Sequence, residues 1–260
     1  MDDITSQLLV NKSNAVVTIS LNRAPANSYY LDYLKLLSGA IRKASQDKEV
    51  KVILLNSTSE KFFCAGADIK IFSTNTSEQN ADMVLAAKEV SREITSSDKI
   101  VVAAIRGHVL GGGLEMIMAC DIRLASEGNY LIGLPEVKLG LMPGNGGTPR
   151  LIDLIGVSRA MELLVTGNSI SPDKAYQYGL FNHIYTKDAF NKEVNTYVNN
   201  LAQGAGKAMS AIKKYVQNHK GLSAEASLQL ETEAVNFLYD TADAKEGFLA
   251  FVEKRKPQFN

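Results

Sequence analysis

The stretch Ile100-Val-Val-Ala-Ala-Ile105, followed shortly by Gly111-Gly-Gly-Leu-Glu115, decides the class of fold. Its first part is a short apolar run rich in β-branched residues, which is typical of a strand buried on both faces. The glycines predict a tight turn, and the apolar run Met116-Ile-Met-Ala-Cys120 predicts a helix that is buried on all sides. Strand, turn and buried helix in this order indicate an α/β protein.

Strand and helix patterns alternate through the rest of the first part of the chain. Apolar runs at residues 8–10 and 16–21 flank a short polar turn, which predicts a hairpin. The same patterns predict helices over residues 31–47 and 79–97 and strands over residues 50–55 and 121–125. Connections of this length favour parallel neighbours, and a doubly wound sheet is the alternative arrangement.

The C-terminal third has a different pattern. From about residue 158 the apolar spacing is helical, with strand character only near residues 181–185. Gly204-Ala-Gly206 is the best candidate for an internal boundary. Beyond residue 244, the aromatic residues Phe248, Phe251 and Phe259 lie among basic residues, and we expect them to be exposed.

Composition excludes several classes of function. The 260 residues are 45% hydrophobic, which is ample for a buried core, and the 28 basic residues balance the 28 acidic ones. This balance gives no basic surface for nucleic acid, so no nucleic-acid partner is expected. Two cysteines cannot form a disulfide framework, and three scattered histidines give no metal cluster. Residues 1–6 begin with acidic side chains, and no run approaches the roughly 20 apolar residues of a membrane span, so we expect a cytoplasmic protein that does not enter a membrane.

Two glutamates, Glu115 and Glu136, each lie just beyond a glycine-rich turn and form a candidate acid and base pair. Most helical glutamates face solvent, but Glu115 precedes an apolar run and Glu136 follows one, so both are expected to be at least partly buried. A carboxylate beside a turn that exposes backbone N–H groups can move a proton while charge builds on a carbonyl oxygen. The stretch Phe62-Phe-Cys-Ala-Gly-Ala-Asp-Ile-Lys70 adds a third glycine-containing turn.

Other chemistries lack their residues. No Gly-Lys-Ser/Thr sequence follows the glycines, and their spacing is not that of a dinucleotide fingerprint, so a nucleotide-binding site is not expected. The Gly-x-Ser-x-Gly motif, the commonest signature of serine hydrolases, does not occur either. We interpret His108 as a structural histidine and Cys64 as a packing residue, because neither has an identifiable catalytic partner.

Several motifs together resemble the crotonase superfamily, close to the enoyl-CoA hydratases, along nearly the whole chain. The motifs are Phe63-Cys-Ala-Gly-Ala-Asp-Ile69, Gly107-x-x-x-Gly-Gly-Gly-x-Glu115, Cys120-Asp-Ile-Arg123, Pro135-Glu136, Gly140-Leu-Met-Pro-Gly-Asn-Gly-Gly-Thr148 and Glu246-Gly-Phe-x-x-Phe-x-x-Lys-Arg-x-Pro257. The resemblance implies an α/β spiral of ββα units over residues 1–203. It also implies a C-terminal helical region, residues 204–260, that builds homotrimers or dimers of trimers.

The resemblance further implies hydration of trans-2-enoyl-CoA to 3-hydroxyacyl-CoA, with coenzyme A as part of the substrate and no separate cofactor or metal. Glu115 would activate water, and Glu136 would protonate C2 of the substrate. The N–H groups of Ala67 and Gly112 would form an oxyanion hole for the thioester oxygen. The residues implied to bind the acyl-CoA are Arg23, Ala65, Asp68, Ile69, Lys70 and Gly144, the last of which would shape the water site.

Some positions depart from the family pattern and leave alternatives open. The loop Ala24-Pro-Ala-Asn27 lacks the family's lysine for the coenzyme A phosphates, so Arg23 and Lys70 are the candidates for that charge. Pro149 replaces a polar residue, and residues 71–83, expected at the acyl pocket, are the least similar stretch. The alternatives are an enoyl-CoA isomerase, a hydratase for a carnitine-like acyl group, and a noncatalytic scaffold. Gly144 argues against the dienoyl isomerases, which have an acid there.

Overall fold

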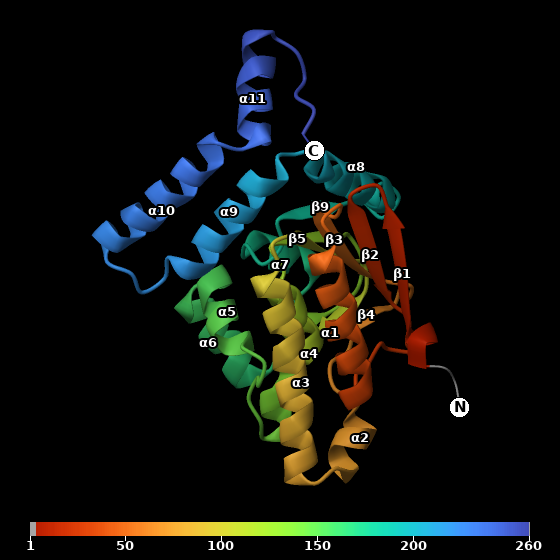
Figure 1. Cartoon of the computed structure of the whole chain (residues 1–260). Coiled ribbons are helices and arrows are strands. Elements are labelled where there is room, and N and C mark those ends of the chain that lie inside the picture. Colours follow the sequence, from red (N-terminus) through yellow and green to blue (C-terminus); the bar gives the residue numbers. More distant parts are fainter. Residues whose placement is uncertain (1–3, 260) are drawn as a thin grey trace.

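Two β-sheets form the centre of the fold, and helices follow their strands (Figure 1). The computed structural model describes residues 4–259, so Met1–Asp3 of the N-terminal stretch considered above lie outside the described part. The strands are β1 (Leu8–Ser13), β2 (Val16–Leu21), β3 (Val52–Ser57), β4 (Phe62–Cys64), β5 (Ile100–Ile105), β6 (His108–Leu110), β7 (Ile122–Ser126), β8 (Ile132–Gly133) and β9 (His183–Tyr185).

The helices pack around these sheets and continue into a C-terminal arm. They are α1 (Leu31–Gln46), α2 (Ile69–Thr74), α3 (Ser77–Ser96), α4 (Gly112–Ala119), α5 (Gly147–Ile155), α6 (Val157–Thr166), α7 (Pro172–Gln177), α8 (Phe190–Ala202), α9 (Gly206–Asn218), α10 (Ala224–Tyr239) and α11 (Ala242–Val252), with 3₁₀ turns η1 (Ile4–Gln7) and η2 (Pro135–Leu139).

The strand order establishes a spiral of ββα units. The large sheet has the order β1-β2-β3-β5-β7-β9, antiparallel only between β1 and β2, and the small sheet has the parallel order β4-β6-β8. Each turn of the spiral adds one strand to each sheet, as in β3–β4 and β5–β6, before a helix follows. The order advances in one direction, whereas a doubly wound sheet reverses at a switch point, so the doubly wound alternative is wrong.

Burial explains why the strong sequence patterns were reliable. On α1, Leu34, Leu37 and Ile41 lie on one face and are all buried against the sheets. All eight residues of α4 are buried, which confirms the predicted helix without a polar face. The long helix α3 begins two residues before the expected position, because Thr76 caps it in a reciprocal capping box with Gln79.

The sequence patterns did not predict the short elements. The strands of the small sheet contain only two or three residues each, too few for a period to show. The helical part also begins earlier than residue 158, since α5 starts at Gly147 inside a glycine-rich stretch. Pro149 lies in the first turn of α5, where a missing N–H costs no intrahelical hydrogen bond.

Helix α9 is fixed to the body by a buried cation. The Lys213 ammonium donates to the carbonyls of Ile94 and Lys99, each at 2.9 Å, and lies 2.8 Å from a carboxylate oxygen of Asp121. Its three donors are therefore satisfied by three acceptors. Helix α10 has no buried residue, and α10 and α11 extend away from the body (Figure 1). The division between residues 203 and 204 stays a prediction.

Within residues 4–259, no helix combines the length and the apolarity needed to cross a membrane.

Candidate active site

A cavity of about 220 Å³ opens where the turn after β4, the start of α4 and the segment from η2 to α5 meet. Helices α2 and α3 supply its remaining wall. The predicted site residues that line it are Ala65, Ala67, Ile69, Gly112, Glu115, Glu136 and Gly144. Residues from three glycine-containing turns, far apart in the sequence, therefore share one cavity.

Glu115 lies in the first turn of α4 and is only 3% exposed. Its Oε1 accepts hydrogen bonds from the backbone N–H groups of Asn145 at 2.7 Å and Gly147 at 2.8 Å. Both of these hydrogen bonds are made to Oε1. Burial raises the pKa of Glu115 above its usual value, and these two hydrogen bonds oppose part of that rise. One oxygen is thus held in place while the other can accept a proton from a bound water.

Glu136 lies in η2, directly after the last strand of the small sheet. Its Oε2 is buried and has no hydrogen-bond partner within the described residues. Burial, with a smaller contribution from the charge of Glu115, raises the pKa of Glu136 from 4.5 to about 7. The backbone of Gly111 has a φ of 52° and leaves room for this carboxyl group, since a Cβ there would lie 3.2 Å from its Oε1. Glu136 can therefore hold a proton near neutral pH.

Two backbone amides of the cavity wall have no partner within residues 4–259. They are the N–H groups of Ala67, in the turn after β4, and of Gly112, the first residue of α4. Partial positive charge at a helix N-terminus favours a negative oxygen at Gly112. Two unpaired donors on one cavity can receive a carbonyl oxygen on which negative charge develops.

Three expected binding residues do not line the cavity. Arg23 pairs with Asp68 at 2.9 Å, and its guanidinium also lies over the Tyr30 ring, 5.0 Å from the centroid. Lys70 is exposed at the start of α2. The first two side chains thus bind each other in the loop beside the cavity, and the predicted contacts of all three residues with coenzyme A stay predictions.

Sequence reasoning missed other residues of the cavity. Tyr29 and Asn145 carry polar groups into its wall, whereas Phe72 and Met83 belong to the stretch already expected at the acyl pocket. Further apolar residues also line the cavity, namely Val84, Ala87, Leu139, Leu141 and Met142. Leu139 ends η2 and residues 140–142 follow it without regular structure, so no periodic signal identified them.

The structure supports the interpretation of His108 and Cys64 as structural residues. His108 Nδ1 accepts a hydrogen bond from the backbone N–H of Leu131 at 2.9 Å, which joins β6 to the segment before β8. Cys64 is fully buried, and burial raises its thiol pKa to about 12, so it is not a nucleophile at neutral pH. Within the described part of the chain, no group of His, Cys, Asp and Glu has the arrangement of a metal site.

Comparison with known proteins agrees with this geometry. The model of the enoyl-CoA hydratase/isomerase family matches residues 11–260. The chain belongs to this family. A protein named probable enoyl-CoA hydratase, from Bacillus subtilis (strain 168), is 36% identical over 255 residues, which cover 97% of each chain. The short-chain-enoyl-CoA hydratase of Clostridium acetobutylicum is 33% identical, with 96% of each chain covered.

Family membership extends to the three-dimensional structure. A crystal structure described as an enoyl-CoA hydratase from Geobacillus kaustophilus HTA426 matches with a TM-score of 0.95 and 37% identity. The match covers 98% of this chain and 97% of that one. The fold is therefore the crotonase spiral with its C-terminal helices.

Proposed function

We propose that the protein adds water across the double bond of trans-2-enoyl-CoA thioesters to give 3-hydroxyacyl-CoA. The observation that carries the proposal is one cavity with two carboxyl groups in different surroundings and two unpaired backbone amides. Relatives that cover nearly the whole chain are named enoyl-CoA hydratases. Coenzyme A enters as part of the substrate, and the reaction requires no further cofactor.

The arrangement assigns each group a step. Glu115, whose Oε1 is held by two backbone amides, removes a proton from water through Oε2 as the water oxygen bonds to C3 of the substrate. The electrons of the double bond shift toward the thioester oxygen, whose negative charge the amides of Ala67 and Gly112 stabilise. Glu136, whose pKa of about 7 lets it carry a proton, delivers that proton to C2. Water is consumed, and the protons balance once Glu115 passes its proton back to Glu136 through solvent.

The alternatives are weaker on physical grounds. A noncatalytic scaffold has no use for a buried Glu136 oxygen without a partner, because an unpaired buried acceptor is destabilising. A carnitine-like cationic acyl group would meet an apolar wall that includes Phe72, Leu139 and Met142. This wall suits a plain hydrocarbon acyl group. Isomerisation remains open for the same cavity, since it needs only one proton-carrying group and the oxyanion site.

The proposal is tested by following loss of the conjugated enoyl absorbance with trans-2-enoyl-CoA thioesters of increasing acyl length. We expect turnover of at least one member of the series, with formation of the 3-hydroxyacyl-CoA product measured by chromatography. Saturated acyl-CoA thioesters of the same lengths serve as inhibitors that report binding without chemistry. Binding of the saturated series with no hydration of any enoyl thioester would contradict the proposal.

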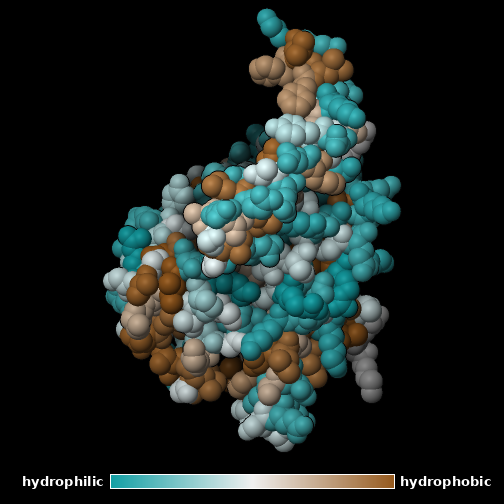
Figure 2. Space-filling model, turned by 60° about the vertical axis from the view of Figure 1, so that its left-hand side comes forward, coloured by the Kyte–Doolittle hydropathy of each residue, from teal (hydrophilic) through white to brown (hydrophobic). Residues whose placement is uncertain are grey.

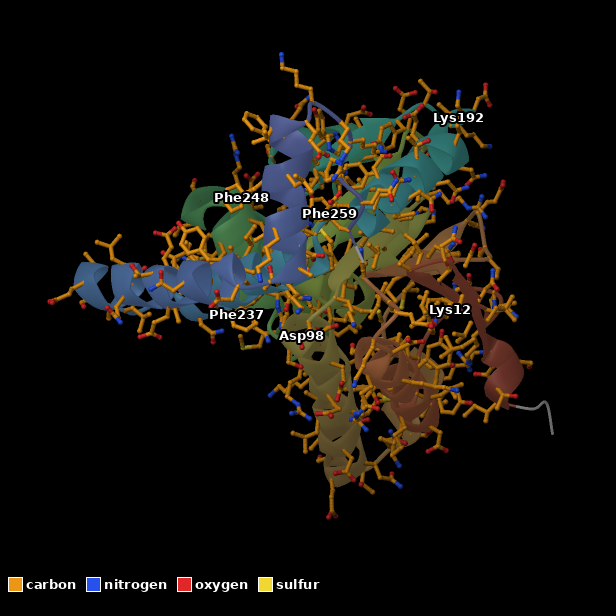
Figure 3. All side chains as sticks on the ribbon, turned by 45° about the horizontal axis from the view of Figure 1, so that its top comes forward. Lys12, Asp98, Lys192, Phe237, Phe248 and Phe259 are labelled. Carbon is orange, nitrogen blue, oxygen red and sulfur yellow. The ribbon has the colours of Figure 1, made fainter. Side chains whose placement is uncertain are left out.

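We also propose that the protein assembles as a homotrimer or as a dimer of trimers. Apolar side chains lie among polar ones on the projecting arm in Figure 2, and the exposed apolar residues of α10 and α11 include Phe237 at 64%, Phe248 at 63% and Phe251 at 85% exposure. Figure 3 places Phe237 on α10 and Phe248 on α11, while Phe259 lies against α11 and is only partly exposed, contrary to the sequence expectation. An arm of this composition needs a partner to cover it.

Light scattering or sedimentation at micromolar concentration is expected to give the mass of a trimer or hexamer. The double substitution Phe237→Asp and Phe248→Asp should release smaller species, because charge would enter the covered surface. Val10→Asp, which places one such charge at an exposed apolar position on β1, is the control and should leave the assembly intact. A monodisperse wild-type monomer would contradict this assembly.

A further inference from the structure

Tyr29 lies next to both unpaired amides of the cavity, those of Ala67 and Gly112. Its backbone N–H donates to the carbonyl of Gly66 at 2.9 Å, and its carbonyl accepts from the N–H of Asp68 at 2.8 Å. These bonds form a parallel bridge between Tyr29 and Ala67. The tyrosine backbone is therefore fixed beside the first amide.

The Tyr29 ring reaches from this bridge to the second amide. A Cβ built on Gly112 would lie only 1.7 Å from the Tyr29 hydroxyl oxygen, so the phenol occupies the place that any side chain at position 112 would need. The close approach requires glycine at this position. The hydroxyl thus lies beside the start of α4, at the wall of the cavity that carries the amides of Ala67 and Gly112.

Among the described residues, the Tyr29 hydroxyl has no hydrogen-bond partner. Tyr29 is 6% exposed, and no hydrogen bond reaches its hydroxyl from residues 4–259. Tyr130, at 5% exposure, is a contrast, since its hydroxyl donates to the Ser126 carbonyl at 2.6 Å. Buried hydroxyl groups are normally paired, and Tyr29 lines the cavity, so its partner is expected on the bound molecule.

The surroundings keep this hydroxyl a proton donor. Burial, and to a smaller extent the charges of Cys64, Glu115 and Glu136, raise the pKa of Tyr29 well above its usual value. The phenol is therefore neutral at neutral pH. A neutral phenol that is fixed in place can donate a hydrogen bond without first reorganising.

Resting on the hydratase function proposed above, we infer that the Tyr29 hydroxyl donates a third hydrogen bond to the thioester oxygen, beside the amides of Ala67 and Gly112. The enolate-like state places more negative charge on that oxygen than the substrate does, so a donor there stabilises the transition state more than the bound substrate. Loss of the hydroxyl should therefore lower kcat more than it changes KM.

The test compares Tyr29→Phe with Tyr33→Phe. Tyr33 is the control, because its hydroxyl is buried without a partner among the described residues and it does not line the cavity. Tyr29→Phe is expected to lower kcat for crotonyl-CoA hydration by roughly 10- to 100-fold, with KM changed less than about threefold. Tyr33→Phe should retain the wild-type kcat. Tyr29→Phe with a kcat within about twofold of wild type would overturn the inference.

A second measurement determines how strongly the site stabilises a bound enolate, and it does not require turnover. Bound acetoacetyl-CoA forms an enolate that absorbs in the near ultraviolet, and the pH of its formation reports the donors around its oxygen. Tyr29→Phe should raise this apparent pKa by about one unit, which is a tenfold change in the equilibrium. An unchanged value would overturn the inference, even if kcat falls, because the hydroxyl would then act elsewhere.

The two proposals fail in different ways. A wild-type protein that hydrates no enoyl-CoA contradicts the proposed function, while the acetoacetyl-CoA titration still decides the role of Tyr29. If Tyr29→Phe does not fold, site-specific replacement of Tyr29 with 3-fluorotyrosine keeps the ring and makes the phenol a stronger donor. The bound enolate should then form at lower pH, and no shift in that direction would refute the third hydrogen bond.

Discussion

Glu136→Gln is expected to lower kcat for crotonyl-CoA hydration by ~10²-fold or more, because an amide cannot donate the proton that general acid catalysis requires. The substitution preserves the size of the side chain, and the wild-type group already holds a proton near neutral pH. Saturated butyryl-CoA should therefore bind as it does to the wild type. Glu127→Gln, at an exposed glutamate outside the cavity, is the matched control and should retain full activity.

The same substitution also has an expected effect on stability. This effect distinguishes a loss of catalysis from a loss of the folded state. Because the pKa of Glu136 rises from 4.5 in the unfolded chain to about 7 in the folded protein, the folded state retains a proton that the unfolded state releases. The stability that this proton contributes is complete below the unfolded pKa and is lost as pH rises toward about 7. Glutamine has no such loss.

The melting temperature of Glu136→Gln should therefore equal or exceed that of the wild type at pH 8, and the difference should shrink toward pH 4.5. Calorimetry at the two pH values measures this. Near-wild-type hydration by the pure, folded variant would remove Glu136 from the mechanism. A lower melting temperature at pH 8 would instead show that the carboxylate stabilises the folded protein.

Glu115→Gln is expected to abolish hydration of a 2-enoyl-CoA, since an amide cannot take the proton from the attacking water. Its amide oxygen can still accept the hydrogen bonds from Asn145 and Gly147, so the loop before α5 should keep its position. Binding of a saturated acyl-CoA and the melting temperature are the measurements that check this.

The Glu115 variant should separate hydration from isomerisation. Glu136 lies on the same cavity and can move a proton between C2 and C4 of a 3-enoyl-CoA over an enolate held by Ala67 and Gly112. Isomerisation needs one such group, whereas hydration also needs a positioned nucleophile. Some conversion of a 3-enoyl-CoA should therefore persist, measured by the gain of conjugated absorbance. Equal loss of both reactions, with unchanged binding, would show that the two glutamates act as a single unit.

The sequence predicted those parts of the fold whose signal is local. The buried helix α4 follows from an unbroken apolar run, and the same run predicts the burial of its Glu115. The resemblance of several motifs then supplied the spiral topology, which periodicity alone left open between two arrangements. Short strands such as β8, with two residues, are set by pairing with distant neighbours rather than by their own sequence.

The cavity was less predictable, because it depends on contacts between distant segments. Tyr29 follows a loop with no periodic pattern, and its place beside Gly112 arises only when that loop pairs with the turn at Ala67. Arg23, one of the two candidates for the coenzyme A phosphates, pairs with Asp68, which lies far along the chain. Neither contact leaves a signal in the spacing of residues.

The three acceptors around Lys213 determine where homologous chains can exchange segments. An exchange at the Gly204 boundary with a chain that has no cation at this position would leave the Asp121 carboxylate and two carbonyls inside the body without their partner. An exchange after α9 would leave all of these groups paired, because α10 buries none of its residues in the body. The segment whose exchange keeps the Lys213 cluster intact is therefore α10 with α11, and α9 is inherited together with the spiral.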